Sequence, residues 1–173
     1  MSFFKFPKHP LPVYEIPEFF PDNELLDIVK LREKVSEAGS PIPLLKKAHE
    51  SSDAILNIRY KQEQSIEQIV RGRAWVVDEI LKLAWKALNW PDPSEICLIA
   101  VGGYGRGELL PHSDVDLLVL TKNGWHKKYR DYISSFLTML WDIGLEPGHS
   151  VRSIRQCKHE ASKDITVATA LME

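Results

Sequence analysis

Apolar residues follow a helical spacing over much of the first half of the chain. Over residues 44–88 they recur every three or four positions, which is typical of amphipathic helices. An earlier segment, PDNELLDIVKLREKVSEAG, predicts a shorter helix capped by Asp22 or Asn23 and ended by Gly39. Gly72 marks either a break in the long helical stretch or a point of close packing. The first half of the protein is therefore expected to be largely helical.

The second half combines short apolar runs with helical patterns. ICLIAVGG at 96–103 and VDLLVLT at 115–121 predict buried strands, and LEPGHSVRS at 145–153 predicts a third strand-like segment. A helix is expected before Gly144, and another begins near Asp164. We therefore predict an α/β (α+β) fold, in which helices cover the apolar side of a small mixed sheet and a largely helical N-terminal region leads in.

Prolines divide the beginning of the chain. Residues 1–23 hold five prolines among aromatic side chains, and we expect an extended arm that lies on the body of the domain. SPIP at 40–43 ends the first helix. We therefore separate residues 1–43, the arm and the first helix, from residues 44–173, one compact domain. The last residues, DITVATALME, carry no helix stop signal, so we expect a fragment of a longer protein.

Composition and charge narrow the class of protein. The chain has 173 residues, 44% hydrophobic and 27% charged, which is ordinary soluble composition. A net charge of −2 argues against a protein that coats nucleic acid, and no run approaches the roughly 20 apolar residues of a membrane span. Cys97, expected to be buried in its strand, and Cys157 form no disulfide framework or zinc pattern, which favours the cytoplasm.

The segment VGGYGRGELLPHSDVDLLVL, at 101–120, carries the candidate chemistry. Gly102 and Gly103 end the first strand, and their bare backbone N–H groups can bind phosphate oxygens. No helical pattern follows directly and no Gly-Lys-Ser/Thr occurs, so this is neither a dinucleotide fingerprint nor a P-loop. Arg106 can add a charge-assisted contact to the phosphates. Ser113 either donates a hydrogen bond to a phosphate or fixes the turn.

Asp114 and Asp116 begin the second strand. Because strand side chains alternate, both carboxylates project from the same face. A divalent cation relieves their repulsion, and Mg²⁺ favours one or two carboxylates together with phosphate oxygens and water. Two such ions can hold the attacking and the leaving oxygen of an in-line displacement. The motif therefore predicts phosphate-transfer chemistry that depends on Mg²⁺, or on Mn²⁺ in its place.

This strand, Gly-Gly, D-x-D, strand pattern resembles the nucleotidyltransferase superfamily of polymerase beta. Further segments, LWDIGLEPGHSVR and DITVATALME, make residues 65–173 similar to the N-terminal domain of the bacterial PII uridylyltransferase/uridylyl-removing enzyme family. The resemblance implies transfer of UMP from UTP to a tyrosine of a PII-type signalling protein, with release of pyrophosphate. It also implies that removal of UMP and glutamine sensing belong to later domains, outside this sequence.

The resemblance implies roles for particular residues. Gly102 and Gly103 match the phosphate-binding glycines, and Asp114 and Asp116 match the metal-binding pair. The superfamily has a third carboxylate on a later strand, which acts as a metal ligand or a general base. Glu146 is the candidate for this catalytic role, or else a plain glutamate at the edge of a strand.

Other interpretations stay open. A transferase of the same fold could use another nucleotide or acceptor, and a non-catalytic module would bind a nucleotide without turnover. Arg71 and Arg73 lie either on a solvated helix face or, if that helix packs beside the glycine turn, against phosphates. His149 is either a phosphate ligand or a structural histidine, and His112 is given no role.

Overall fold

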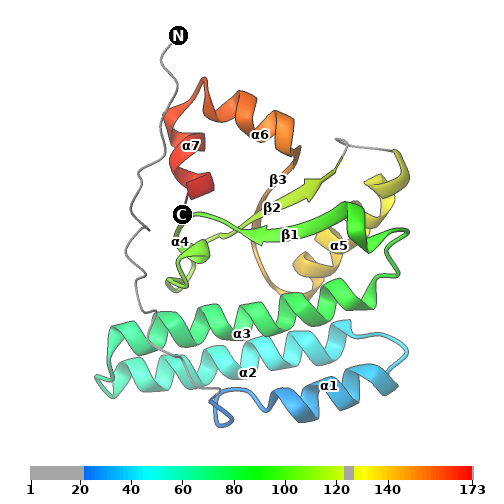
Figure 1. Ribbon diagram of the computed structural model, residues 1–173. Helices are drawn as coiled ribbons and strands as arrows, with labels where there is room; N and C mark the ends of the chain where they lie inside the picture. Colours follow the sequence, from blue (N-terminus) through cyan, green and yellow to red (C-terminus); the bar gives the residue numbers. More distant parts are fainter. Residues whose placement is uncertain (1–21, 123–126, 173) are drawn as a thin grey trace.

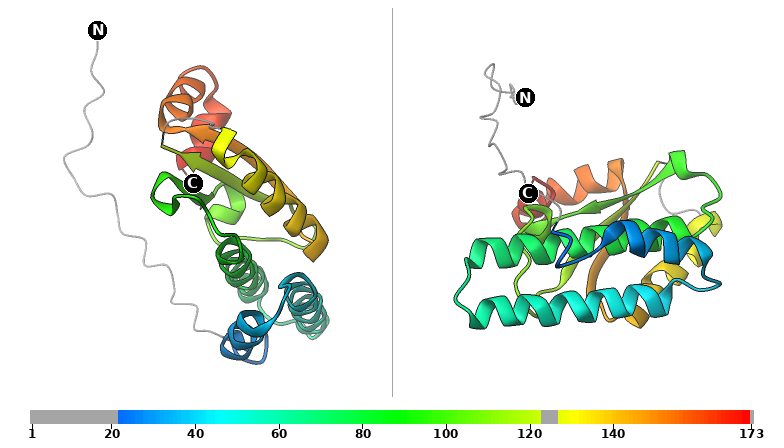
Figure 2. Two further views of the ribbon diagram at one scale, coloured as in Figure 1. Left: turned by 90° about the vertical axis from the view of Figure 1, so that its right-hand side faces the viewer. Right: turned by 90° about the horizontal axis from the view of Figure 1, so that it is seen from below.

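The protein folds as a three-stranded sheet between two groups of helices (Figure 1). The computed structural model describes residues 22–122 and 127–172, so the predicted arm at 1–21 lies outside the described residues. The helices on one side of the sheet are α1 (Ile28–Glu37), α2 (Ile42–Lys61) and α3 (Ile66–Ala87). The helices on the other side are α6 (Ile154–Ala161) and α7 (Ile165–Met172), as a second direction of view also shows (Figure 2).

The sheet is mixed, as predicted. Its strands, in spatial order, are β1 (Ile96–Ala100), β2 (Val115–Thr121) and β3 (Pro147–Ser153). β1 runs antiparallel to β2, whereas β3 runs parallel to β2 and is connected to it through α5 (Lys127–Ile143). Two short elements precede and follow β1, the 3-10 helix η1 (Pro93–Glu95) and the helix α4 (Gly102–Gly105). The central strand therefore begins next to α4 and next to the start of β3.

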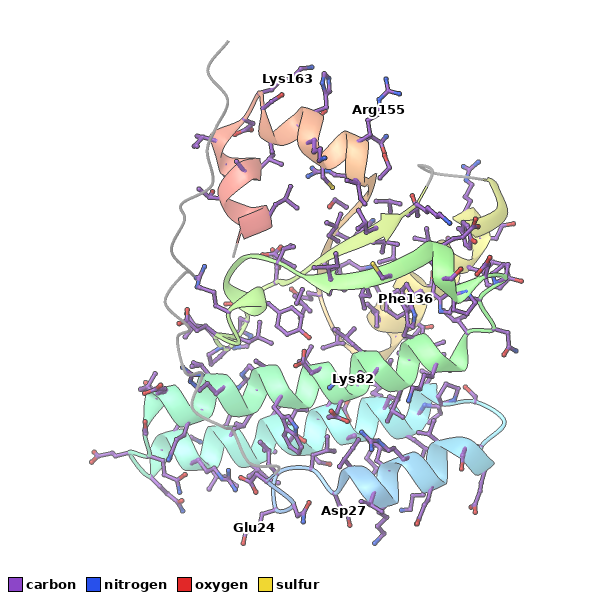
Figure 3. All side chains as sticks on the ribbon, in the orientation of Figure 1. Glu24, Asp27, Lys82, Phe136, Arg155 and Lys163 are labelled. Atoms are coloured by element: carbon purple, nitrogen blue, oxygen red, sulfur yellow. The ribbon has the colours of Figure 1, made fainter. Side chains whose placement is uncertain are left out.

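The core lies on the face of the sheet that α3 and α5 cover. Side chains of β2 alternate, and Val115, Leu117 and Val119 are buried on this face. Phe136 of α5 is buried there too, with its ring 5.0 Å from the ring of Trp85 on α3 (Figure 3). Burial of each such side chain contributes about 1.5–3 kcal/mol. Asp116 lies on the opposite face of β2, towards α6 and α7, and Asp114 directly precedes the strand.

The first helix begins later than its sequence predicts. Asp22 does not cap α1; instead its carboxylate accepts from the N–H of Leu25 at 3.1 Å and holds the preceding turn. The N-cap is Asp27, which accepts from the N–H of Lys30 at 3.0 Å. Leu31 of α1 belongs to the same buried cluster as the sheet, and the predicted division after residue 43 falls in the first turn of α2.

The long helical stretch is a pair of helices rather than one. A turn at 62–65 separates α2 from α3, and Glu63 has a positive φ of 57° there. Gly72 lies buried inside α3, so it is a packing point and not the break. Cys97 is exposed, in contrast to its predicted burial, because it points away from the core face of the edge strand β1. Both cysteines are free, and no helix among the described residues is long and apolar enough to cross a membrane.

Candidate active site

The glycine turn and the aspartate pair open onto one cavity of about 760 Å³. Its size falls within the roughly 300–1,000 Å³ of small-molecule sites. Residues of the predicted site that line it are Gly103, Arg106, Ser113, Asp114 and Asp116. The first turns of α3 form another wall, with the side chains of Ile66, Val70 and Arg71. Segments far apart in the sequence therefore build one cavity at the start of the central strand.

The glycine turn is a short helix, although its sequence does not suggest one. α4 consists of the four residues GGYG, and it begins at Gly102 with a positive φ of 65°. The N–H of Val101 donates to the carbonyl of Asp116 at 3.1 Å, which ties the start of α4 to β2. The amides of Gly102 and Gly103 find no acceptor within residues 22–122 and 127–172. They are therefore available to an anionic ligand.

Two glycines enclose the carboxylate of Asp116. A Cβ added to Gly102 would lie 3.0 Å from Oδ2 of Asp116, and one added to Gly148 would lie 2.5 Å from Oδ1. Gly148 is the direct partner of Asp116 in the parallel pair of β2 and β3. Sequence reasoning missed Gly148, although it stands in the quoted segment GLEPGHSVR. Its contribution depends on the register between two strands, which no local pattern gives.

The electrostatics of the pair suit a divalent cation. Burial, and then the nearby charge of Asp114, raise the pKa of Asp116. Two carboxylates that repel each other in this way gain from a shared cation. Among the described residues no group of three or more His, Cys, Asp and Glu side chains could hold a metal ion. Two carboxylates suit an ion such as Mg²⁺, which can take its remaining ligands from phosphates and water.

Positive side chains flank the cavity on two sides. Arg106 lines it and pairs with Glu108, with Nε 3.2 Å from Oε2. Arg71 of α3 lines it as well and pairs with Glu67 at 3.2 Å, so α3 does pack beside the glycine turn. Ser113 lies on the rim, and its N–H donates to the carbonyl of Leu110 at 3.2 Å. Both arginines therefore line the same cavity as the aspartate pair.

Glu146 does not line this cavity. It precedes β3, its carbonyl accepts from the N–H of Val115 at 3.0 Å, and it borders a smaller cavity of about 110 Å³. His149 is exposed on β3 and borders neither cavity. His112, to which sequence gave no role, borders both cavities and has a positive φ of 62°. The position of Glu146 therefore gives no support to its predicted role as a third carboxylate.

Arg73 is neither solvated nor in the larger cavity. It is buried, forms an ion pair with Asp53 of α2, and its Nε has no hydrogen-bond partner in the described part of the chain. His49 lies 4.0 Å from Asp53 in the same group, and all three residues border the smaller cavity. Burial lowers the pKa of His49, and Arg73 adds to this effect. This group joins α2 to α3 behind the site.

Paired carboxylates beside an open glycine turn are the geometry expected of a nucleotidyltransferase. Comparison with known proteins finds the same class of protein. Residues 81–164 match the family model described as a nucleotidyltransferase domain. The match spans α4, the aspartate pair and β3, which together build the site.

Similar proteins of known name indicate which kind of nucleotidyltransferase this chain resembles. The chain is 47% identical over 152 residues to the bifunctional uridylyltransferase/uridylyl-removing enzymes of Pseudomonas putida (strain W619), Azotobacter vinelandii (strain DJ) and Pseudomonas entomophila (strain L48). Each match covers 88% of this chain and 17% of the relative, so the chain spans less than a fifth of the proteins it resembles. No solved structure matches the chain. These matches confirm the resemblance to the uridylyltransferase/uridylyl-removing enzymes that the sequence motifs indicate.

Proposed function

We propose that this chain transfers UMP from UTP to a tyrosine hydroxyl of a PII-type signalling protein and releases pyrophosphate. The observation that carries the proposal is the aspartate pair, Asp114 and Asp116, on the wall of a cavity that Gly103 also lines. A triphosphate and two carboxylates share such a cavity favourably only with a divalent cation between them. The names of the relatives, uridylyltransferase/uridylyl-removing enzymes, support UMP as the transferred group.

In this proposal the chain binds and orients both reactants. The amides of Gly102 and Gly103 bind the β- and γ-phosphates, and Arg106 adds positive charge. Asp114 and Asp116 would hold Mg²⁺ or Mn²⁺, which when bound neutralises phosphate charge and stabilises the leaving oxygen. The tyrosine oxygen forms a bond to the α-phosphorus as the bond to the bridging β-phosphate oxygen breaks. Pyrophosphate leaves on the opposite side, and the hydroxyl proton passes to water.

Ser113 has a supporting part. Ser113 lines the cavity, so its hydroxyl can donate a hydrogen bond to a phosphate oxygen there. Glu146 is left out of this mechanism because it borders the neighbouring cavity. Removal of UMP, the second activity in the name of the relatives, is not proposed for this chain.

The test begins with calorimetric binding of UTP and ATP, each with and without Mg²⁺, to this chain and to Asp116→Asn. Binding that requires Mg²⁺, prefers UTP and is lost in the variant supports the proposal. Labelling of a purified PII-type protein from radioactive UTP, and loss of the label when its tyrosine is replaced by phenylalanine, then tests the acceptor.

Other results of the binding and labelling experiments would indicate a different function. Equal or tighter binding of ATP, without label on the PII-type protein, would indicate a transferase with another substrate. Tight nucleotide binding with no turnover towards any acceptor would indicate a regulatory module. Absence of any nucleotide binding would overturn the proposal for this chain.

A further inference from the structure

The side chain of Tyr104 joins the glycine turn to the long helix α3. α4 consists of Gly102, Gly103, Tyr104 and Gly105, so Tyr104 is its single residue with a side chain beyond Cα. The hydroxyl of Tyr104 donates a hydrogen bond of 2.5 Å to Oδ1 of Asp78 on α3. Only 4% of Tyr104 is exposed. A turn otherwise made of glycines therefore has one side-chain attachment to the helical layer.

A helix of four residues has little stability of its own. Its first turn fixes several backbone dihedrals in return for few hydrogen bonds, and glycines make that cost larger. Backbone bonds hold its two ends, from Val101 to Asp116 and from the N–H of Glu108 to the carbonyl of Gly103 at 3.0 Å. Neither bond fixes how far the turn lies from α3. The contact between Tyr104 and Asp78 is placed to do so.

The position of this contact relates it to the cavity. Tyr104 lines the cavity with the aspartate pair, and it also lines a groove of about 340 Å³ between α3 and β1, where Asp78 lies. Arg71, two turns before Asp78 on α3, lines the same cavity as Gly103 of the glycine turn. A fixed distance between Tyr104 and α3 therefore fixes the width of the cavity between Gly103 and Arg71.

The surroundings of the Tyr104 hydroxyl favour its protonated form. Burial, and then the charge of Asp78, raise the pKa of the Tyr104 hydroxyl far above its usual range. The phenol consequently remains protonated and serves as a donor. The carboxylate of Asp78 is half-buried and loses a good partner if that hydroxyl is removed.

We propose that Tyr104 is a positioning residue, which through Asp78 holds the amides of Gly102 and Gly103 at the spacing from α3 that a nucleoside triphosphate requires. The proposal rests on the proposed function only in that the ligand is a nucleoside triphosphate. It predicts a specific loss: the triphosphate part of the ligand is bound less well, while the base and the α-phosphate are affected less. Tyr104 itself does not take part in the chemistry.

The experiment measures the affinity of three variants, and of a control variant described below, for UTP and for UMP in the presence of Mg²⁺. Tyr104→Phe keeps the ring and removes the donor, Asp78→Ala removes the acceptor, and Asp78→Asn keeps an oxygen that accepts. Since small displacements of positioning groups cost up to about a hundredfold, we expect Tyr104→Phe and Asp78→Ala to weaken UTP binding by roughly tenfold. UMP binding should change by less than about threefold, and Asp78→Asn should bind UTP nearly as wild type does, because its bond is retained.

The chain offers a matched control. Tyr129 of α5 is also buried and donates its hydroxyl to a carboxylate, Oε2 of Glu95, at 2.7 Å, but it lies outside the cavity. Tyr129→Phe removes an equivalent buried hydrogen bond and should leave the affinity for UTP unchanged. If it weakens UTP binding as much as Tyr104→Phe does, general loss of stability explains both and the proposal is wrong.

Other results with the Tyr104 and Asp78 variants also decide whether Tyr104 positions the glycine turn. Equal losses for UTP and UMP, or wild-type affinity in Asp78→Ala, would overturn the positioning role. If Tyr104→Phe does not fold, the pair Asp78→Ala and Asp78→Asn gives the same test. Failure of the wild-type chain to bind UTP or ATP would overturn the proposed function itself, which distinguishes that result from a failure of this inference.

Discussion

The carboxylate of Asp116 and the bare Cα of Gly148 face each other across the parallel pair of β2 and β3. A Cβ at Gly148 would lie 2.5 Å from Oδ1 of Asp116, closer than carbon and oxygen approach without a bond. The φ of Gly148 is not positive, so its own backbone does not require glycine. The neighbouring carboxylate does, and this makes Gly148 part of the candidate site.

Gly148→Ala is predicted to impair the site and to leave the fold intact. The added methyl group must displace the Asp116 carboxylate, so we expect Mg²⁺-dependent UTP affinity to fall by about tenfold or more. The strand itself tolerates alanine, whose lower unfolded-state entropy adds about 0.5–1 kcal/mol of stability. Calorimetry with UTP, alongside thermal unfolding, measures both effects. Gly39→Ala is the control, because nothing lies within 4 Å of its added Cβ.

Asp116→Asn is predicted to abolish nucleotide transfer and to raise the thermal stability of the metal-free protein. Loss of a cation ligand should lower the transfer rate by on the order of a hundredfold or more. The pKa of Asp116 is raised in the fold by burial and by Asp114, so its stabilising contribution exists below the unfolded pKa and is lost as pH rises through the folded value. At neutral pH the ionised group therefore opposes folding, and the neutral amide does not.

Two measurements check this variant. Melting temperatures at pH 7 without divalent cations should be equal to or above that of wild type, and a transfer assay should show little product. A lower melting temperature together with retained transfer would contradict the assignment of the aspartate pair.

Glu146→Gln is predicted to leave transfer within about threefold of wild type, a change as small as surface substitutions usually produce. The reason is that Glu146 lines the 110 Å³ cavity and does not line the larger cavity onto which the aspartates open. Steady-state rates at saturating UTP decide the question. A loss comparable to that of Asp116→Asn would restore Glu146 as the third carboxylate that the family resemblance implies.

Stability is predicted to fall on mild acidification because of His49. Burial lowers its pKa in the fold, and Asp53, which opposes the shift from 4.0 Å, is already paired with Arg73. A lowered folded pKa gives stability that is present above the unfolded value of about 6.5 and is lost as pH falls through the folded value. Urea unfolding at pH 7.5, 6.5 and 5.5 should show this decline, and His49→Gln should reduce it. An unchanged slope in the variant would exclude His49 as its source.

Local sequence patterns predicted much of the fold. The strand at 115–121 has the bounds that its apolar run predicts, and α5 ends at Ile143, directly before the predicted stop at Gly144, which has a positive φ of 95°. The meeting of the glycine turn with Asp114 and Asp116 also follows from sequence, since one short segment carries all of them. These features depend on neighbours in the chain, and composition and spacing report on such neighbours directly.

Other features depend on residues that are distant in sequence. The sequence around Arg73 is typical of a surface arginine, but α2 places Asp53 next to it and the two form an ion pair. The sequence around Cys97 is typical of a buried strand, but this strand lies at the edge of the sheet and Cys97 is exposed. α4 has a composition that disfavours helix and is held by contacts to β2 and α3. The roles of Tyr104 and Gly148 come from such tertiary contacts, so no window of sequence could have shown them.

The parallel pairing of β2 with β3 has a consequence for the order of folding. β1 and β2 are antiparallel neighbours in sequence and can pair early. β3 follows α5 in the sequence, so its pairing with β2 has to close a loop that contains the whole of this helix. Until then the aspartates are present without Gly148 beside them. Competence to bind a nucleotide should therefore arise after most of the helical content, and a fluorescent UTP analogue present during refolding would report the last step of assembly.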